Sequence, residues 1–332
     1  MDQIKNILIT GGSGKIGRNL IPELLNAGYH LRVLEFEPEN PPYDTNRVEM
    51  VRGALGTPGL AEKLIEDMDA VIHLANVKER KDLFMKANIQ GTFDLLDACR
   101  AAGKQIKQFI QAGSDARAGI YYNPRPYPID ENFPHSAYPG YYAFSKVLEE
   151  TMCEQYRYQY GLPITVLRFS WVHGEDDILA HATTAEPGFG VPVWSELAVS
   201  GYQKSHFQGG RNAACCMVHP DGKPCMRHIV ALEDVIHGCM QAVANPAAIG
   251  HAFTIAGPSA FTYDVLSKRI SEKLGIPAVD FVNPEYHDFQ HSLSKSRSIL
   301  GYNPTYDIIK IVDSAIEYRQ QGNKRSLCKY PG

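Results

Sequence analysis

Residues 7–17 read ILITGGSGKIG, an apolar run that leads directly into glycines at positions 11, 14 and 17. The pattern predicts a strand followed at once by a helix over 15–27. In such a strand-turn-helix, Gly11 permits the tight turn, Gly14 lets the backbone approach a pyrophosphate, and Gly17 allows close packing of the helix on the strand. The unpaired N–H groups at the helix start would face the phosphates. The stretch therefore predicts a dinucleotide-binding site.

The first half of the chain alternates short apolar runs with longer amphipathic segments. We expect strands near 4–10, 30–36, 48–51, 69–74, 107–112 and 164–169. Helices are expected at 15–27, 58–66, 82–102 and 140–160. This alternation is typical of parallel strands joined by crossover helices, so the fold class is predicted to be α/β, a doubly wound parallel sheet of the Rossmann type.

The pattern changes at about residue 171, where a stretch rich in Gly, Pro and His begins and shows little periodicity as far as residue 222. Further helices are expected near 233–245, 262–274 and 306–320. We therefore predict a Rossmann domain over 1–170, with room for later residues to complete its last strand and some helices. A smaller α/β C-terminal lobe over 171–325 is expected to bind mainly the substrate.

Composition narrows the range of partners. The chain has 332 residues, is 44% hydrophobic and carries a formal net charge of -4, which is enough apolar sequence for a large core but no cationic excess. Proteins that bind the phosphate backbone normally need such an excess, so nucleic acid is not expected as a partner. No apolar run approaches the roughly 20 residues of a membrane-spanning helix. The segment MDQIKNILIT leads straight into a strand without a signal sequence.

The cysteines indicate a reducing compartment. Seven cysteines are scattered without the spacing of a disulfide framework or of a paired zinc site, which favours a cytoplasmic location. The cluster of metal-ligating residue types in the second half of the chain fits no paired zinc pattern, and packing is the simpler interpretation. Its members are Cys215, Cys216, His219, Cys225 and His228. We expect no metal.

Glu35 ends the second predicted strand, about 20 residues beyond the glycines, where an acidic side chain can accept hydrogen bonds from the adenosine ribose. A carboxylate there would repel a 2'-phosphate, so Glu35 favours NAD over NADP. The alternative is an ordinary solvated residue at a strand end. Lys15 and Ile16 lie in the glycine turn and are further expected cofactor contacts. The positive charges of Lys15 and Arg32 could weaken the preference for NAD over NADP.

Tyr142 and Lys146 are four residues apart on one face of a predicted helix. A phenol with a pKa of about 10 is a weak base unless a nearby ammonium stabilises its phenolate, and Lys146 can supply that charge. Ser114 follows an apolar run and would lie at the carboxyl end of a strand, where ligands bind in open parallel sheets. Its hydroxyl could hold a substrate oxygen. A surface Tyr-Lys pair and a serine that bonds its own turn are the plain alternatives.

Six segments in order, TGGSGKIG, DAVIHLAN, NIQGTFDLLDACR, QAGSD, YYAFSK and RHIVALEDV, resemble the extended short-chain dehydrogenase/reductases. These form the NAD-dependent epimerase/dehydratase family, which includes proteins like UDP-glucose/galactose 4-epimerase. The resemblance covers essentially the whole chain. It implies that Tyr142 exchanges a proton with a substrate hydroxyl, that Lys146 lowers the pKa of the tyrosine and binds the nicotinamide ribose, and that Ser114 orients the reacting oxygen.

The resemblance also implies cofactor contacts from the HLAN turn and the following helix. The residues concerned are Leu74, Ala75, Asn76 and Asn88. For the two asparagines, a purely structural role in the turn and the helix is equally compatible with the sequence. The long helices 82–102 and 140–160 match a pair that forms a four-helix bundle with its twofold mate in relatives, so a homodimer is expected.

Several positions depart from the family pattern. Trp171 stands where sugar-nucleotide epimerases usually carry an Asn that touches the substrate diphosphate, and Ala54 stands where an adenine-contacting Asp is common. Arg227 does match a phosphate-binding arginine, but no arginine lies between Arg269 and Arg297, where a second is commonly found.

Asp115 raises a further question, because it matches the Asp of the sugar 4,6-dehydratases while the Glu that those enzymes carry beside it is Ala116 here. A dehydratase is therefore disfavoured. Asp115 is either a pocket acid or a loop residue that caps nearby backbone. We expect substrate contacts from Asp115, Trp171 and Arg227. Nearby His173, His181, Phe189 and Trp194 could face a sugar ring or belong to the core.

Together these features predict an NAD-dependent epimerase of a sugar or nucleotide sugar, working by transient oxidation of a secondary alcohol. The runner-up is a net NAD-dependent dehydrogenase or reductase of a free sugar, sugar acid or other small alcohol. A third interpretation, from a different class, is an NAD-binding regulatory protein. Relatives of that kind have lost the catalytic tyrosine or lysine, whereas this chain keeps both Tyr142 and Lys146.

Overall fold

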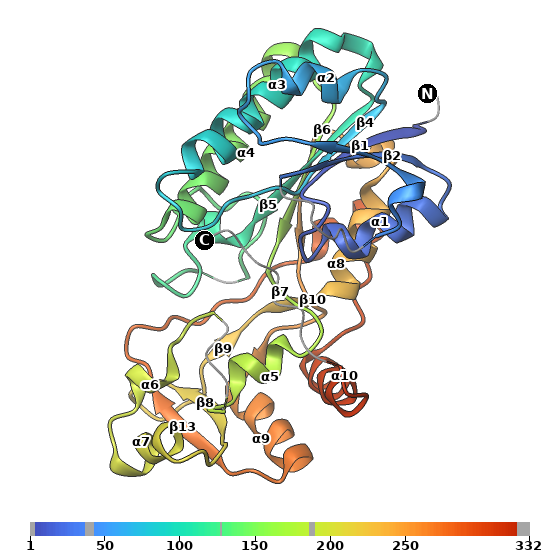
Figure 1. Cartoon of the computed structure of the whole chain (residues 1–332). Helices are drawn as coiled ribbons and strands as arrows, with labels where there is room; N and C mark the ends of the chain where they lie inside the picture. Colours follow the sequence, from blue (N-terminus) through green and yellow to red (C-terminus); the bar gives the residue numbers. More distant parts are fainter. Residues whose placement is uncertain (1–3, 37–42, 127, 186–189, 324–332) are drawn as a thin grey trace.

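The computed structural model describes residues 4–36, 43–126, 128–185 and 190–323. The chain forms two lobes, one around a large central sheet and one smaller (Figure 1). Phe189, which the sequence suggests could face a sugar ring or belong to the core, lies outside the described residues.

The larger lobe is built on a parallel sheet of seven strands in the order β11-β6-β5-β4-β1-β2-β3. The strands are β1 (Asn6–Thr10), β2 (His30–Glu35), β3 (Val48–Arg52), β4 (Ala70–His73), β5 (Gln108–Ser114), β6 (Ile164–Phe169) and β11 (Ala252–Ile255). The six strands expected from the sequence are confirmed, and so is the doubly wound α/β class. The order reverses direction between β1 and β4, where such sheets bind their ligands.

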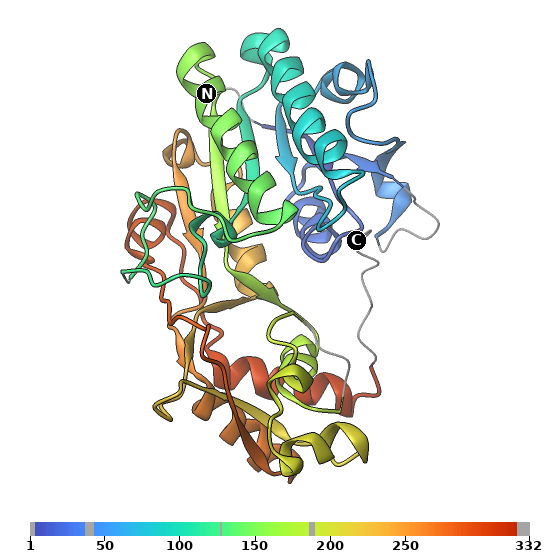
Figure 2. The same ribbon diagram turned by 90° about the vertical axis from the view of Figure 1, so that its left-hand side faces the viewer.

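Helices cover both faces of this sheet (Figures 1 and 2). They are α1 (Gly17–Asn26), α2 (Leu60–Ile65), α3 (Gly91–Ala102), α4 (Tyr141–Tyr160) and α8 (Leu232–Ala242). Alternating residues of β1 show the two layers. Ile7 and Ile9 belong to the buried cluster that includes residues of α1 and α8, whereas Leu8 belongs to the cluster with α2, α3 and α4. A strand points successive side chains to opposite faces, so both faces of β1 must be apolar.

In the described residues, the smaller lobe has three short two-stranded pairings and five helices. Its strands are β7 (Trp171–His173) with β10 (Ile229–Ala231), β9 (Met226–Arg227) with β12 (Phe261–Thr262), and β8 (Ala214–Val218) with β13 (Ala278–Val282). Its helices are α5 (Asp177–Ala182), α6 (Trp194–Leu197), α7 (Gly201–Gln208), α9 (Tyr263–Leu274) and α10 (Ile308–Gln320). This lobe has a core cluster of its own. The division of the chain at 170/171 stays a prediction, since β11 and α8 return to the large sheet from later residues.

Short turns connect these elements. The 3-10 turns are η1 (Thr45–Arg47), η3 (Gly103–Gln105), η4 (Asp115–Ala118) and η5 (Pro246–Ala248), and the π-helical turns are η2 (Met85–Gln90) and η6 (Ser296–Leu300). The expected single helix over 82–102 is thus divided, with η2 preceding α3. The Asn88 carbonyl in η2 accepts the Thr92 hydroxyl at 2.5 Å. A π turn widens the helix locally and is frequent at functional sites. No helix in the described ranges is both long and apolar enough to cross a membrane.

Candidate functional site

The glycine turn joins β1 to α1 as the sequence predicts. Gly11 has a φ of +77°, and a Cβ added there would lie 2.8 Å from the backbone nitrogen of Ala75. At Gly17 an added Cβ would collide with the Gly11 carbonyl oxygen, so only glycine lets α1 pack this closely on the turn. At Gly14 an added Cβ would meet only the Gly11 oxygen, at 3.2 Å. The space beside Gly14 suits the close backbone approach of a pyrophosphate.

Glu35 lies at the end of β2 and is only 5% exposed, so the alternative of a solvated strand-end residue is wrong. Its Oε1 accepts a hydrogen bond from the Tyr43 hydroxyl at 2.7 Å. The same oxygen would lie 2.6 Å from a Cβ added to Gly12, which places the carboxylate directly against the glycine turn. Arg32 instead donates to the Leu64 carbonyl at 3.0 Å. Its charge is therefore directed away from Glu35.

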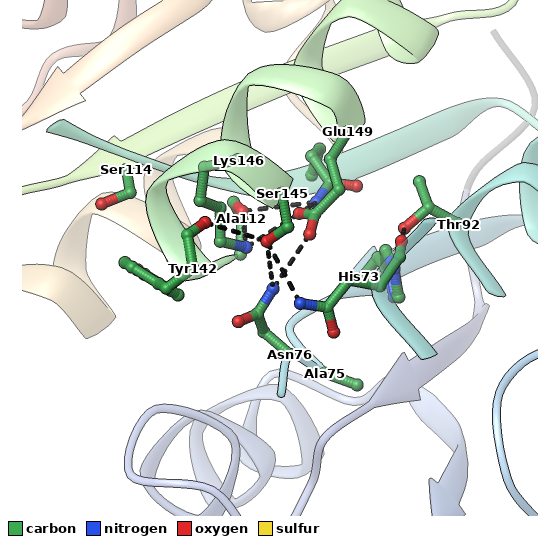
Figure 3. A network of polar contacts seen from close by, with 12 residues as sticks. His73, Ala75, Asn76, Thr92, Ala112, Ser114, Tyr142, Ser145, Lys146 and Glu149 are labelled. Atoms are coloured by element: carbon green, nitrogen blue, oxygen red, sulfur yellow. Dashed lines mark hydrogen bonds and ion pairs between the residues drawn. The ribbon is translucent and has the colours of Figure 1, made fainter. Parts of the chain in front are cut away.

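The catalytic residues expected from the sequence come together at the carboxyl end of β5 (Figure 3). Ser114 ends β5, while Tyr142 and Lys146 lie one turn apart on α4. The Lys146 Nζ lies 5.8 Å from the centre of the Tyr142 ring, and Ser114 acts to lower the pKa of Tyr142. The Ser114 Oγ also accepts a hydrogen bond from the backbone N–H of Ala116 at 3.1 Å. Ser114 therefore bonds its own turn, which is one of the alternatives that the sequence left open.

The start of α4 is fixed by a carboxylate from another segment. Gly140 precedes the helix and provides no capping side chain. The Glu79 carboxylate accepts hydrogen bonds from the backbone N–H groups of Tyr141 at 2.9 Å and Tyr142 at 3.3 Å. A negative charge at a helix N-terminus satisfies these unpaired donors and favours the helix dipole. Glu79 therefore holds the first turn, which carries Tyr142, in place.

Burial and charge oppose each other at Tyr142 and Lys146. Burial raises the pKa of Tyr142, while the Lys146 charge and the Ser114 hydrogen bond act to lower it, and the pKa remains raised overall. Burial acts to lower the pKa of Lys146, but the neighbouring Glu149 carboxylate and Tyr142 together act to raise it, and that pKa remains raised overall. Lys146 therefore stays an ammonium at neutral pH, and Tyr142 stays a protonated phenol in this state.

Glu149 is a site residue that the sequence interpretation missed. It lies on α4 three residues after Lys146, and its carboxylate accepts hydrogen bonds from Lys146 Nζ at 2.9 Å, Gln111 Nε2 at 3.0 Å and Asn76 Nδ2 at 2.9 Å. Figure 3 shows this network beside the catalytic residues. The available signal was the spacing of three from Lys146, since residues three apart on a helix are neighbours.

The two asparagines of the expected cofactor set face the catalytic helix. Asn88 exchanges two hydrogen bonds of 2.8 Å with the backbone of Val77 and donates to the Ser145 hydroxyl at 3.1 Å. Asn76 donates to Glu149 as described. Each therefore has a structural partner on α4 or in the segment after β4, as one interpretation of the sequence foresaw. Their contact with a cofactor stays a prediction.

The remaining residues of the expected cofactor set surround the glycine turn. Ala75 donates its backbone N–H to the Thr10 hydroxyl at 3.2 Å, and Leu74 packs against the core cluster on the α1 face. Ile16 packs against the same cluster. Lys15 forms an ion pair of 2.5 Å with Asp177 of the smaller lobe.

Asp115 is buried in η4 and bonds side chains rather than backbone. Its Oδ2 accepts from the Ser170 hydroxyl at 2.9 Å and lies 3.3 Å from His291 Nε2, while the Ser114 hydroxyl is 3.3 Å from Oδ1. The backbone N–H of Ala116 bonds Ser114, not Asp115. The interpretation of Asp115 as a backbone-capping loop residue is therefore wrong. Asp115 therefore links Ser114 to Ser170 and His291.

Arg227 and Trp171 form a closed stack. The guanidinium carbon of Arg227 lies 4.1 Å from the Trp171 ring centre and 5.4 Å from that of Tyr121. The Arg227 NH1 group donates to the Val191 carbonyl at 2.8 Å and to the Tyr263 hydroxyl at 3.1 Å. Arg227 is only 3% exposed. In this arrangement the arginine expected to bind a phosphate is enclosed by protein groups.

The histidines and the second tryptophan near this stack are buried. Trp171 contacts the rings of His173 and His181, with centres 4.2 and 4.8 Å apart, and Trp194 lies 5.7 Å from His181. These side chains pack on one another in the smaller lobe. They therefore form part of its core.

The cysteines within the described ranges are all buried, and no disulfide joins them. His219 and Cys225 lie near Asp288, with their ligand atoms within 4.8 Å of one another. The Asp288 Oδ1 lies 2.9 Å from His219 Nε2 and accepts from the Met226 N–H at 2.7 Å. The contact between His219 and Asp288 therefore stabilises the turn after β8.

The fold and the Ser114, Tyr142 and Lys146 arrangement define an extended short-chain dehydrogenase/reductase. Residues 7–256 match the model of the NAD dependent epimerase/dehydratase family, which is more than half of the chain. The chain therefore belongs to this family, whose members are enzymes.

Individual relatives are distant. The chain is 25% identical over 347 residues to the uncharacterized protein y4nG of Sinorhizobium fredii, covering 99% of this chain and 82% of the relative. Among solved structures it resembles a short-chain dehydrogenase/reductase superfamily protein from Agrobacterium tumefaciens with bound NAD, at a TM-score of 0.80, 21% identity and coverage of 96% and 98%. It also resembles a UDP-glucose 4-epimerase from Thermotoga maritima with UDP-glucose, at a TM-score of 0.73, 21% identity and coverage of 96% and 99%. At these identities the two structures show the shared fold.

Proposed function

We propose that this protein is an NAD-dependent sugar epimerase that works by transient oxidation of a secondary alcohol. The observation that carries the proposal is the meeting of Ser114, at the end of β5, with Tyr142 and Lys146 of α4, where the Lys146 Nζ lies 5.8 Å from the Tyr142 ring centre. Family membership supports the same chemistry. The family relatives named for UDP-sugars make a nucleotide sugar one candidate substrate.

In the proposed reaction, Ser114 and Tyr142 hold the substrate hydroxyl. The Tyr142 oxygen, as phenolate, takes the hydroxyl proton while a hydride leaves the same carbon, which converts the alcohol to a ketone. NAD held at the glycine turn would supply the acceptor for that hydride. Lys146 stabilises the phenolate through its positive charge. Return of the hydride to the opposite face, with return of the proton from Tyr142, gives the epimer without net oxidation.

The residues around the glycine turn fit a dinucleotide. The open space beside Gly14 suits the pyrophosphate, and the start of α1 presents N–H groups to it. Glu35 is placed to accept bonds from the adenosine ribose, with one carboxylate oxygen already oriented by Tyr43. Lys15 belongs to the same turn, and in our proposal it exchanges its bond with Asp177 for one with the cofactor.

A second candidate is a net NAD-dependent dehydrogenase of a free sugar or sugar acid. It is favoured by the enclosure of Arg227 between Trp171 and Tyr121, with the Val191 carbonyl bonded to its guanidinium. An arginine engaged in this way offers little to a substrate diphosphate. A compact substrate without a nucleotide would need no such contact.

We also propose a homodimer formed through α3 and α4. Large apolar side chains are exposed on this pair and on the turn before it: Met85, Phe93, Phe144 and Tyr160. Exposed apolar groups gathered on neighbouring helices are a common feature of protein interfaces. A cytoplasmic location is part of the proposal, because the buried cysteines of the described residues suit a reducing compartment.

The function is tested by incubating purified protein with NAD and a panel of UDP-sugars, free sugars and sugar acids. Product isomerisation without NADH accumulation supports the epimerase, whereas steady NADH accumulation supports the dehydrogenase. The variant Tyr142→Phe, which lacks only the hydroxyl, serves as the control. Equal turnover by the variant and the parent protein would contradict both enzymes as proposed.

A further inference from the structure

A buried carboxylate touches the catalytic lysine. Glu149 is only 1% exposed, and its Oε2 lies 2.9 Å from the Lys146 Nζ. The same carboxylate accepts hydrogen bonds from the side-chain amides of Gln111 on β5 and Asn76 after β4. Glu149 is thus held by three elements of the fold at once. Such a fully bonded carboxylate is a fixed feature of the site and not a mobile surface group.

The network also fixes the direction of Lys146. An ammonium has three N–H groups. One donates to the Ala112 carbonyl at 2.9 Å and one to Glu149. Within the described residues these are the two hydrogen-bond acceptors of Nζ, so the third N–H is left for the ligand side of the site. Glu149 therefore restricts the lysine to one orientation below Tyr142.

Charged and titratable groups face Tyr142 from several elements. Lys146 and Glu149 face it from α4, and Asp115 faces it from η4. The segment after β4 contributes Lys78, whose Nζ lies 5.3 Å from the Tyr142 ring centre, and Glu79 at the helix start. Tyr138 lies within electrostatic range from the segment before α4. Among these carboxylates, Glu149 is the one that contacts Lys146 directly. Its negative charge therefore compensates the lysine charge at hydrogen-bond distance.

We infer that Glu149 is a positioning residue of the active site, which orients Lys146 and offsets its charge, so that the pH at which Tyr142 ionises depends on Glu149. This inference rests on the proposed catalytic role of Tyr142. The direction follows from charge: Glu149 disfavours a phenolate nearby, while Lys146 favours it. Neutralising Glu149 should therefore leave the ammonium less compensated and allow Tyr142 to ionise at lower pH, over the range in which Lys146 is an ammonium.

The variant Glu149→Gln is suited to the site because it keeps the size of the side chain. Its amide oxygen can accept from Lys146 and Gln111 as one carboxylate oxygen does now. Its amide nitrogen would face Asn76, whose Oδ1 is buried and lacks a hydrogen-bond partner in the described part of the chain. Rotation of the Asn76 amide by half a turn would bring that oxygen to the new donor. The substitution therefore removes the charge and keeps the bonds of this side chain to Lys146, Gln111 and Asn76.

The matched control is Glu150→Gln, one position further along α4. Glu150 is also buried, but its carboxylate bonds Arg168, with Arg168 Nε at 2.9 Å, and does not contact Lys146. Glu149→Asp, which keeps the charge, is the conservative variant. Glu149→Ser is a second neutral variant, in case the amide prevents folding. Folding of each variant is checked by circular dichroism.

The experiment is a spectroscopic titration of tyrosinate, in which the signal of Tyr142 is isolated as the difference between each protein and its Tyr142→Phe counterpart. We expect the Tyr142 transition to move to lower pH in Glu149→Gln and in Glu149→Ser. At a pH below the midpoint, the fraction of Tyr142 in the tyrosinate form should be about threefold larger than in the parent protein, which corresponds to a shift of about half a pH unit. The transition should stay at the parent position in Glu150→Gln and close to it in Glu149→Asp. An unmoved transition in both neutral variants, or an equal movement in Glu150→Gln, would overturn the inference.

The titration needs no substrate, so its outcome is separate from that of the proposed function. Absence of turnover on every sugar, with the expected shift, would refute the proposed reaction and leave the link between Glu149 and Tyr142 standing. Turnover that depends on Tyr142, without any shift of the transition, would support the proposed reaction and refute the link between Glu149 and Tyr142. Where turnover is found, the acid limb of its pH profile should move in the same direction as the titration.

Discussion

Two alanine substitutions in the glycine turn should separate packing from cofactor binding. At Gly17 the added methyl would lie closer than 3.0 Å to backbone atoms of both Gly11 and Gly12. Backbone cannot yield as a flexible side chain can, and overpacking of this kind costs about 2 kcal/mol. Alanine is the better helix former by about 1 kcal/mol in a helix interior, but Gly17 is the first residue of α1, where that gain is smaller. Steric conflict should therefore dominate.

At Gly14 the same methyl meets only the Gly11 oxygen, at 3.2 Å, so a shift of a few tenths of an ångström accommodates it. We expect Gly14→Ala to change stability by less than about 0.5 kcal/mol. The methyl would instead occupy the space proposed for the pyrophosphate. NAD affinity should fall by roughly tenfold or more, equivalent to about 1.4 kcal/mol.

The assays are thermal unfolding followed by circular dichroism and NAD binding followed by calorimetry. Gly17→Ala should lower Tm by roughly 4 °C or more, and Gly14→Ala should leave Tm near the parent value while it weakens NAD binding. A Gly17→Ala protein with unchanged Tm would refute the packing argument. A Gly14→Ala protein that binds NAD as tightly as the parent would refute the placement of the pyrophosphate.

Three other outcomes follow from the site. Glu35→Gln removes the charge that would repel a 2'-phosphate, so the ratio of NADP to NAD affinity should rise by about tenfold, and an unchanged ratio in competition binding would place the adenosine ribose elsewhere. Trp171→Ala should uncover Arg227 and strengthen binding of UDP measured by calorimetry; unchanged binding would show that the stack does not exclude a nucleotide. Burial, assisted by the charges of Lys15 and Lys146, lowers the pKa of Lys78 to about 8. Because Lys78 is charged below that pH and neutral above it, affinity for anionic NAD should fall as pH rises through 8, and Lys78→Arg should abolish that fall; a persistent fall in the arginine variant would exclude Lys78 as its origin.

The sequence identifies those parts of the site that depend on local order along the chain. The glycines between an apolar run and a helix, Glu35 at the next strand end, and the spacing of Tyr142 and Lys146 are all local patterns. The carboxyl ends of parallel strands meet at one edge of the sheet, so such patterns also predict which residues converge. Even here, the burial of Glu35 depends on Tyr43, a contact that the pattern does not indicate.

Contacts between segments that lie far apart in the chain could not be predicted from the sequence. Enclosure of Arg227 requires Tyr121, Trp171, Val191 and Tyr263 to meet, and no spacing in the sequence connects them. Likewise β11 joins the sheet next to β6, although more than eighty residues separate them in the chain. Glu149 was overlooked for another reason. A charge three residues from a lysine on a helix is common at surfaces, and only burial against Gln111 distinguishes this one.

The most direct test of the proposed catalysis is a turnover measurement with NAD and the sugar panel on the parent protein, Tyr142→Phe and Lys146→Met. We expect isomerisation or NADH formation by the parent and a loss of about 10²-fold or more in both variants, as removal of a general acid-base group produces. NAD binding by Tyr142→Phe should be retained, which separates lost chemistry from a lost site. Full turnover by Tyr142→Phe on any substrate of the parent would contradict the proposed role of this tyrosine.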